Sequence, residues 1–179
     1  IKMEVSMAEV VANTGVSKDK GYLYYLGKDG NVWRSQMARA GKGGGNAEKV
    51  ADYLTTKKIV NRVIYPKYQL GIHKERADKY LEDGAGPLVG FELEGGIEAG
   101  KAFIDNLELI YHVANIGDAR TLAIHPASTT HSQLNSEDQL RAGVTPGYIR
   151  LSVGIEHIDD IIHDIDQAIN KAQEKVKSV

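Results

Sequence analysis

An apolar stripe near the end of the chain constrains the fold more than any other feature of the sequence. Isoleucine and alanine recur at steps of three and four residues, at Ile158, Ile161, Ile162, Ile165, Ala168, Ile169 and Ala172. This spacing places them on one face of an α-helix, with polar residues on the other face. Such a helix is stabilised mainly by packing, so the rest of the chain must supply an apolar surface for it to cover.

Helical and extended patterns alternate before this helix. We expect helices over about 46–58, with Asn46 as its cap, over 73–81 and 97–107, and a short one from Ser136. The extended segments are VNRVIYP, LVGFEL, LELIYHV and YIRLSVG. Strands separated by helices predict an α/β fold, an α+β sandwich in which the helices pack on one face of a mainly antiparallel sheet.

A glycine-rich window, AGKGGGN, marks a change in charge along the chain. Residues 1–45 hold seven Lys and Arg against four Asp and Glu, a net charge of +3, and because the whole chain carries -2 the remainder carries -5. All six histidines follow this window. We therefore expect two domains, residues 1–45 and residues 46–179, joined by a flexible glycine-rich linker.

Composition excludes several classes of protein. No apolar run approaches the ~20 residues that cross a bilayer, and no targeting segment is recognisable, so a cytoplasmic protein without a membrane partner is expected. The chain has no cysteine, which excludes disulfides and thiolate metal sites. A net charge of -2 also argues against a polyanionic partner for the chain as a whole.

The segment KGYLYYLGKDGNVWRSQMAR predicts a β-hairpin. An Asp-Gly pair favours a type I′ turn between strands of about 22–28 and 31–37. Its aromatic and basic residues suggest a stacking surface for single-stranded nucleic acid, formed by Tyr22, Tyr24, Trp33 and Arg34. We favour the alternative of a small structural core, because a lone hairpin is marginal in water and must pack on something.

Other candidate sites have weaker support in the sequence. The histidine pairs 125/131 and 157/163 are six residues apart, which is not a metal-ligand spacing, so no metal is expected. Three consecutive hydroxyls, Ser128, Thr129 and Thr130, precede His131 but lack a placed acidic partner. Hydroxyl-rich loops more often satisfy local backbone groups, so we expect no nucleophile in this run.

Arg150 is the most informative polar residue. In YIRLSVG, alternation directs Ile149 and Leu151 to one face of the strand and Tyr148 and Arg150 to the other. A mid-strand arginine is costly to cover unless its guanidinium meets an anion. Two interpretations stay open, an intramolecular salt bridge or exposed sheet face, and bidentate binding of a carboxylate.

Four long stretches carry a resemblance to a known family. They are NAEKVADYL, GGIEAGKAFIDNL, HVANIGDARTLAIHPASTTHSQL and EDQLRAGVTPGYIRLSVGIEHIDDIIHDIDQAI. Together they resemble the carboxy-terminal domain of the pyridoxal-phosphate enzymes of cysteine and methionine metabolism, and within that group the O-acetylhomoserine sulfhydrylases. The resemblance runs from Asn46 to about Ala172.

The resemblance implies a fold-type I enzyme, normally a homotetramer, that converts O-acetylhomoserine and sulfide to homocysteine and acetate. It implies that Arg150 binds the α-carboxylate of the amino-acid substrate and that Thr121 lies beside it. The cofactor lysine and phosphate cup of such enzymes belong to a large domain, which residues 1–45 do not resemble. We therefore expect this chain alone to bind no pyridoxal phosphate, to be inactive and to self-associate. The alternatives are one half of a two-chain enzyme, and a fusion whose hairpin binds nucleic acid or protein.

Overall fold

The computed structural model describes residues 15–17, 22–26, 32–36, 45–81 and 84–177. The chain divides into two compact units, Ile1–Arg39 and Ala40–Val179. Each unit is treated separately below. The domain boundary that the sequence predicts at residues 45/46 stays a prediction.

The first unit contains an antiparallel pair of strands, β1 (Tyr22–Leu26) and β2 (Val32–Gln36). Their register places Tyr24 opposite Arg34 and Tyr25 opposite Trp33. This pairing confirms the strands expected from the sequence, whereas the Asp-Gly turn lies outside the described residues. Nucleic-acid contacts of Tyr22, Tyr24, Trp33 and Arg34 stay a prediction.

The second unit is built on a five-stranded sheet. The spatial order of its strands is β3 (Val60–Ile64), β4 (Leu88–Leu93), β7 (Tyr148–Ser152), β6 (Leu122–Ile124) and β5 (Tyr111–His112). The β3/β4, β4/β7 and β7/β6 pairs are antiparallel, and only the β5/β6 pair is parallel. The mainly antiparallel α/β architecture that the sequence predicts is therefore confirmed.

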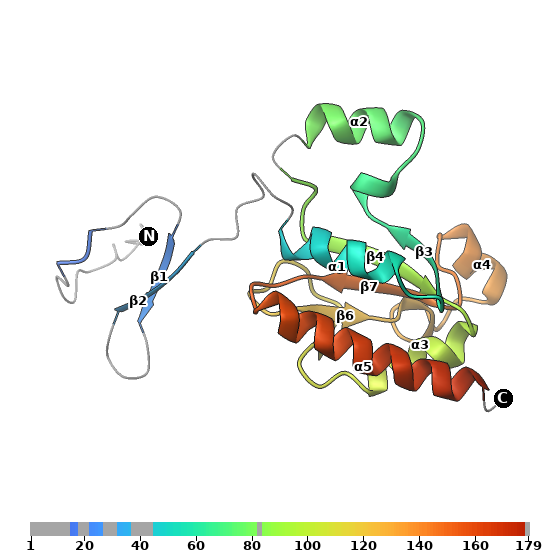
Figure 1. The fold of residues 1–179 in the computed structure, drawn as a ribbon. Helices are drawn as coiled ribbons and strands as arrows, with labels where there is room; N and C mark the ends of the chain where they lie inside the picture. Colours follow the sequence, from blue (N-terminus) through green and yellow to red (C-terminus); the bar gives the residue numbers. More distant parts are fainter. Residues whose placement is uncertain (1–14, 18–21, 27–31, 37–44, 82–83, 178–179) are drawn as a thin grey trace, which may run out of the picture. The chain divides into compact units, whose positions relative to one another are not determined.

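Three helices cover one face of this sheet: α1 (Asn46–Thr55), α3 (Gly96–Asp105) and α5 (Ile158–Lys177) (Figure 1). The apolar stripe of α5 is confirmed, with Ile161, Ile165 and Ile169 buried against the core. Phe91 of β4 meets Phe103 of α3 edge to face, with ring centroids 5.4 Å apart. Stability therefore comes mainly from the sheet face that these helices cover.

Two elements differ from the sequence-based expectation. The extended segment at 107–113 forms only the two-residue strand β5, because its backbone is bound elsewhere. The Asp164 carboxylate of α5 accepts the backbone N–H groups of Glu108, Leu109 and Ile110 at 2.8–3.0 Å. Strand β6, in contrast, was not expected from the sequence and lies fully buried between β7 and β5.

The start of α1 also differs. Asn46 is the first residue of the helix and does not cap it. Its side-chain amide instead donates to the carbonyl oxygens of Glu156, at 2.8 Å, and Gly154, at 3.4 Å. The helix begins where this long-range pair of hydrogen bonds fixes the chain.

Two short helices complete the unit beside the sheet: α2 (Ile72–Tyr80) and α4 (Ser136–Arg141), which Asn135 caps by accepting the N–H of Asp138 at 2.9 Å. In Figure 1, α2 stands apart from the sheet and from the layer of α1, α3 and α5. Within the part of the chain that the structure describes, no helix has the length and apolar character needed to span a bilayer.

Candidate functional site

The sheet face opposite α1, α3 and α5 carries the candidate site. Backbone pairing aligns Ile64 of β3, Gly90 of β4, Arg150 of β7 and Ile124 of β6 in one row across four strands. A pocket of about 620 Å³ lies over this row and extends to α2. Ile64, Gly90 and Arg150 all line it, so the row forms the floor of the pocket.

Arg150 sits on this floor as strand alternation predicts. Its neighbours Ile149 and Leu151 are buried in the core, whereas Arg150 and Tyr148 are half-buried on the pocket side. One guanidinium nitrogen, Nη2, donates to the carbonyl oxygen of Asn115 at 3.3 Å. Arg150 belongs to none of the ion pairs found across residues 45–81 and 84–177. The guanidinium therefore keeps donors for an anion entering the pocket.

Tyr148 and Gly90 shape the pocket beside Arg150. A Cβ atom at position 90 would lie 2.7 Å from the Tyr148 hydroxyl and 2.8 Å from the ring, so the tyrosine occupies space that glycine leaves free. Burial raises the pKa of Tyr148, and the positive charges of Arg150 and Arg62 oppose that rise. Tyr148 is thus a neutral hydroxyl next to a fixed cation.

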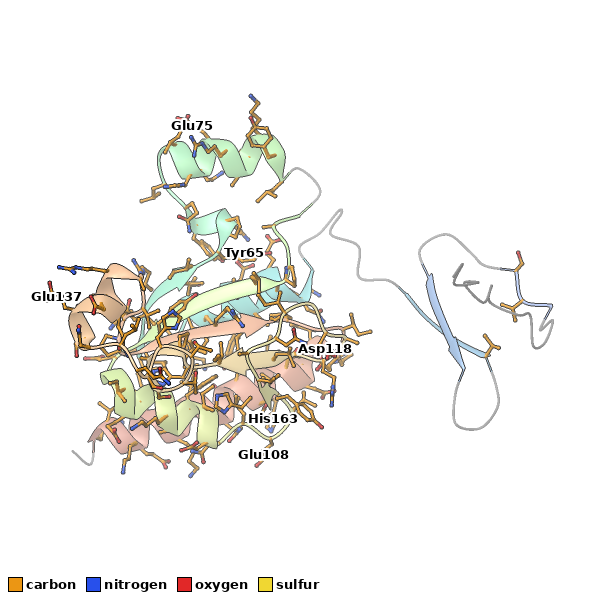
Figure 2. All side chains as sticks on the ribbon, turned by 180° about the vertical axis from the view of Figure 1, so that it is seen from behind. Tyr65, Glu75, Glu108, Asp118, Glu137 and His163 are labelled. Carbon is orange, nitrogen blue, oxygen red and sulfur yellow. The ribbon has the colours of Figure 1, made fainter. Side chains whose placement is uncertain are left out.

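The segment 115–121 forms the ridge next to Arg150. The Gly117 N–H donates to the Ser152 hydroxyl at 3.0 Å, and the Ile155 N–H donates to the Ala119 carbonyl at 2.9 Å. Figure 2 shows Asp118, which belongs to this ridge, at the opposite end of the domain from Glu137 of α4. These hydrogen bonds hold the ridge against β7 and fix the carbonyl that receives Arg150.

Thr121 lies at the end of this ridge with its hydroxyl already engaged. The side chain is fully buried; Oγ1 donates to Glu156 at 2.8 Å and accepts the Gly154 N–H at 2.9 Å. Its own N–H donates to Glu156 at 2.6 Å. Thr121 is not among the residues that line the pocket with Arg150. Its assignment to the substrate stays a prediction, and its contacts support the turn at 154–156.

The hydroxyl-rich run next to β6 is organised by His125. This histidine is fully buried, and its Nε2 lies 2.7 Å from the Pro146 carbonyl, which can only accept a hydrogen bond. Nε2 therefore carries the proton, and Nδ1 accepts from the Ser128 hydroxyl at 2.7 Å. Thr129 donates to the His125 carbonyl at 2.8 Å. These hydroxyls satisfy local groups, as the sequence led us to expect.

Sequence reasoning missed the wall of the pocket opposite Arg150. That wall belongs to α2, which contributes His73, Arg76, Ala77 and Tyr80. No local pattern in the sequence indicates that this helix faces β7. Gly90 was detectable in principle, because a glycine inside a strand often marks a close approach of a ligand or neighbour.

Metal binding has no geometric support here. Among the residues that can be placed, no group of three or more His, Asp or Glu side chains is arranged to hold a metal ion. The described residues that line the Arg150 pocket include two arginines and a histidine but no lysine. This part of the lining thus carries positive charge and has no amine for a covalent cofactor.

Comparisons with known proteins show which family the chain matches. Residues 35–170 match the model of the Cys/Met metabolism PLP-dependent enzymes. The chain is 53% identical over 126 residues to the O-acetyl-L-homoserine sulfhydrylase of Leptospira meyeri, covering 70% of this chain and 28% of that protein. It is 48% identical over 124 residues to O-acetyl-L-homoserine sulfhydrylase 1 of Thermus thermophilus, covering 69% of this chain and 30% of that protein.

A solved structure gives the same assignment. The chain is similar to an O-acetylhomoserine (thiol)-lyase from Campylobacter jejuni, whose structure contains a pyridoxyl-lysine monophosphate group. The TM-score is 0.64 at 40% identity, covering 70% of this chain and 30% of that one. The chain therefore spans less than a third of the length of these relatives.

Proposed function

The chain belongs to the Cys/Met metabolism PLP-dependent enzyme family, and from this membership we propose that its second unit binds the substrate carboxylate in an O-acetylhomoserine sulfhydrylase-like enzyme. The reaction would replace the acetoxy group of O-acetylhomoserine with sulfide, giving homocysteine and acetate. Two relatives that carry the sulfhydrylase name, at 53% and 48% identity, support this choice of chemistry.

The observation that carries the proposal is the state of Arg150. Its guanidinium is half-buried on the pocket floor, has one backbone carbonyl as a partner and takes part in no ion pair of the described domain. A planar guanidinium with free donors matches both oxygens of a carboxylate. Arg150 would hold the α-carboxylate, and Tyr148 beside it would limit the directions from which the substrate enters.

The family's cofactor supplies the remaining chemistry. Bound pyridoxal phosphate acts as an electron sink for the substrate carbanion. None of the described residues that line the Arg150 pocket is a lysine, so they do not fit the covalent attachment of that group. We propose that the role of this domain is to bind and orient the amino acid. The cofactor-binding residues would come from outside the described domain.

Self-association belongs to the same proposal. Around α2, Leu70 is 85% exposed and Ile72 is 53% exposed. Large apolar side chains gathered in one region of a surface favour contact with another protein surface. We propose that a further domain or a second copy covers this region in the assembled enzyme.

The carboxylate assignment is tested by titrating the protein with O-acetyl-L-homoserine and following NMR chemical shifts. The methyl ester of the same compound, in which the carboxylate is masked, is the matched ligand. We expect Arg150→Gln to weaken binding of the free acid at least about tenfold, because a hydrogen bond to a charged group contributes about 1.5–3 kcal/mol. The ester should bind weakly to both proteins.

The control variant is Arg62→Gln. Arg62 is an exposed arginine on β3 that faces Glu92, with 3.7 Å between the Arg62 Nε and a Glu92 oxygen, and it does not line the pocket. Its replacement should leave the affinity for the free acid within twofold. Equal loss in both variants, or no loss in Arg150→Gln, would contradict the assignment.

A further inference from the structure

Helix α2 forms the wall of the pocket that faces the sheet. Its residues His73, Arg76, Ala77 and Tyr80 all line the pocket, and their spacing of three and four residues places them on one side of the helix. No residue of α2 is buried. The helix therefore presents its inner side to the pocket space and not to a packed core.

The segment that leads into α2 is held by side-chain contacts, although α2 itself is not packed into the core. The 3₁₀-helix η1 (Pro66–Tyr68) precedes α2 and is tied to α1. The Lys67 amine binds Glu48 at 2.8 Å and Asp52 at 3.0 Å, and the Tyr68 hydroxyl also donates to Asp52. Figure 2 shows Tyr65 between the sheet and α2, where it lines the pocket. The chain thus enters α2 from a fixed point.

Among the described residues that line the pocket, the permanent charges are of one sign. They are Arg76 and Arg150; His73 lies with them, and none of these described lining residues is Asp or Glu. On α2 itself, the neighbouring Lys74 pairs with Asp78, whereas Arg76 takes part in no ion pair that the described residues form. Two permanent cations, one on α2 and one on the floor of the pocket, therefore face the same space, and no described lining residue supplies a carboxylate to pair with them.

The rest of the pocket lining is mostly apolar. Ile64 and Val89 contribute from the sheet, and Ala77 and Tyr80 contribute from the helix. An apolar lining that also carries two cations fits a ligand that has an anionic group at each end of a short hydrocarbon chain. A ligand with a single carboxylate would neutralise only one of the two arginines.

Resting on the carboxylate role of Arg150, we propose that Arg76, assisted by His73, forms a second anion subsite on α2. The ligand class is a dicarboxylate, including an amino acid whose side chain ends in an anionic group. Arg76 determines specificity for the distal end of the ligand, while Arg150 holds the proximal carboxylate.

The test compares adipate with hexanoate, which has the same number of carbons and one carboxylate fewer. Both are titrated into the protein and followed by NMR chemical shifts at low salt, because exposed charges are screened by salt. We expect adipate to bind about tenfold more tightly than hexanoate. Arg76→Gln should remove this difference and leave the hexanoate affinity within twofold.

Two further variants make the outcome specific. Lys79→Gln removes a cation from the same helix; the Lys79 amine lies over the Tyr80 ring, and Lys79 does not line the pocket, so adipate should bind as before. Arg150→Gln should weaken both ligands. Arg76 is an exposed residue with no packing role, so its replacement leaves the fold intact, as a circular dichroism spectrum would verify.

Equal affinity for adipate and hexanoate would overturn the second subsite, as would an Arg76→Gln variant that weakens both ligands equally. If Arg150→Gln weakens both ligands while Arg76→Gln changes neither, only the second subsite is wrong. If Arg150→Gln changes neither ligand, the proposed carboxylate function itself is wrong.

Discussion

Replacing Thr121 by valine should destabilise the protein strongly although the change is nearly isosteric. The Thr121 hydroxyl is fully buried and makes two hydrogen bonds, one to the Glu156 carboxylate and one from the Gly154 N–H. Valine keeps the shape and removes both bonds. The variant therefore isolates the contribution of the hydroxyl from that of packing.

The magnitude follows from the burial of each partner. The hydrogen bond to Glu156 involves a charged group, which contributes about 1.5–3 kcal/mol, and a buried N–H left unpaired costs about 1–3 kcal/mol. Glu156 is half-exposed and regains water in the variant, whereas Gly154 is buried and does not. We therefore expect a loss of about 2–4 kcal/mol in the free energy of unfolding, with a melting temperature lower by about 5–15 °C.

Urea unfolding followed by circular dichroism gives the free energy directly, and the chain offers a matched control. The buried Thr145 hydroxyl finds no hydrogen-bond partner in the described structure. The same exchange at that position, Thr145→Val, removes an unpaired polar group and should cause no loss. Thr121→Ser should recover most of the stability, because it restores the hydroxyl. The reasoning is refuted if Thr121→Val costs less than about 0.5 kcal/mol or if both valine variants cost the same.

Two further perturbations test other contacts. Asp164→Asn should lower the free energy of unfolding by about 2–4 kcal/mol, because an amide nitrogen would meet backbone N–H groups that now donate to the carboxylate. Urea unfolding measures this loss. The control is Asp160→Asn, which changes an exposed residue of the same helix. Burial lowers the pKa of His125 below 6.5, so the folded state keeps it neutral while the unfolded chain binds a proton below that pH. Stability should fall from pH 7 to pH 5, and His125→Gln should flatten this dependence; an unchanged slope in the variant would exclude His125 as its source.

The sequence predicted the fold most accurately where apolar residues repeat at a helical or strand spacing, because such a repeat identifies the buried face. The stripe of α5 and the alternation Ile149–Arg150–Leu151 each identify a buried face from neighbouring residues alone. The extended pattern at 107–113 failed for the opposite reason. Asp164, more than fifty positions away, binds the backbone there and replaces strand pairing, which no local pattern reports.

The candidate site was predictable only in part. The position of Arg150 on the open sheet face follows from its strand, and the carboxylate role that we propose for it rests on the family resemblance. Arg76 was not predictable, because α2 has a polar composition typical of an exposed helix and only the tertiary structure brings it opposite β7. The Thr121 N–H and hydroxyl both donate to Glu156, which lies 35 positions further along the chain. No local sequence pattern indicates that these two residues meet.

One face of the sheet supports the fold, and the opposite face carries the proposed binding pocket. Residues such as Phe91 and Leu151 support the fold on the helix-covered face, whereas Ile64, Gly90 and Tyr148 on the opposite face line the pocket. Substitutions of Ile64 and Tyr148 therefore leave the main core intact, whereas a side chain at position 90 first requires the Tyr148 ring to move. A lineage built on this domain could change its ligand by successive single replacements in which position 148 changes before position 90, with each intermediate remaining folded. The architecture thus favours divergence of specificity within one stable framework.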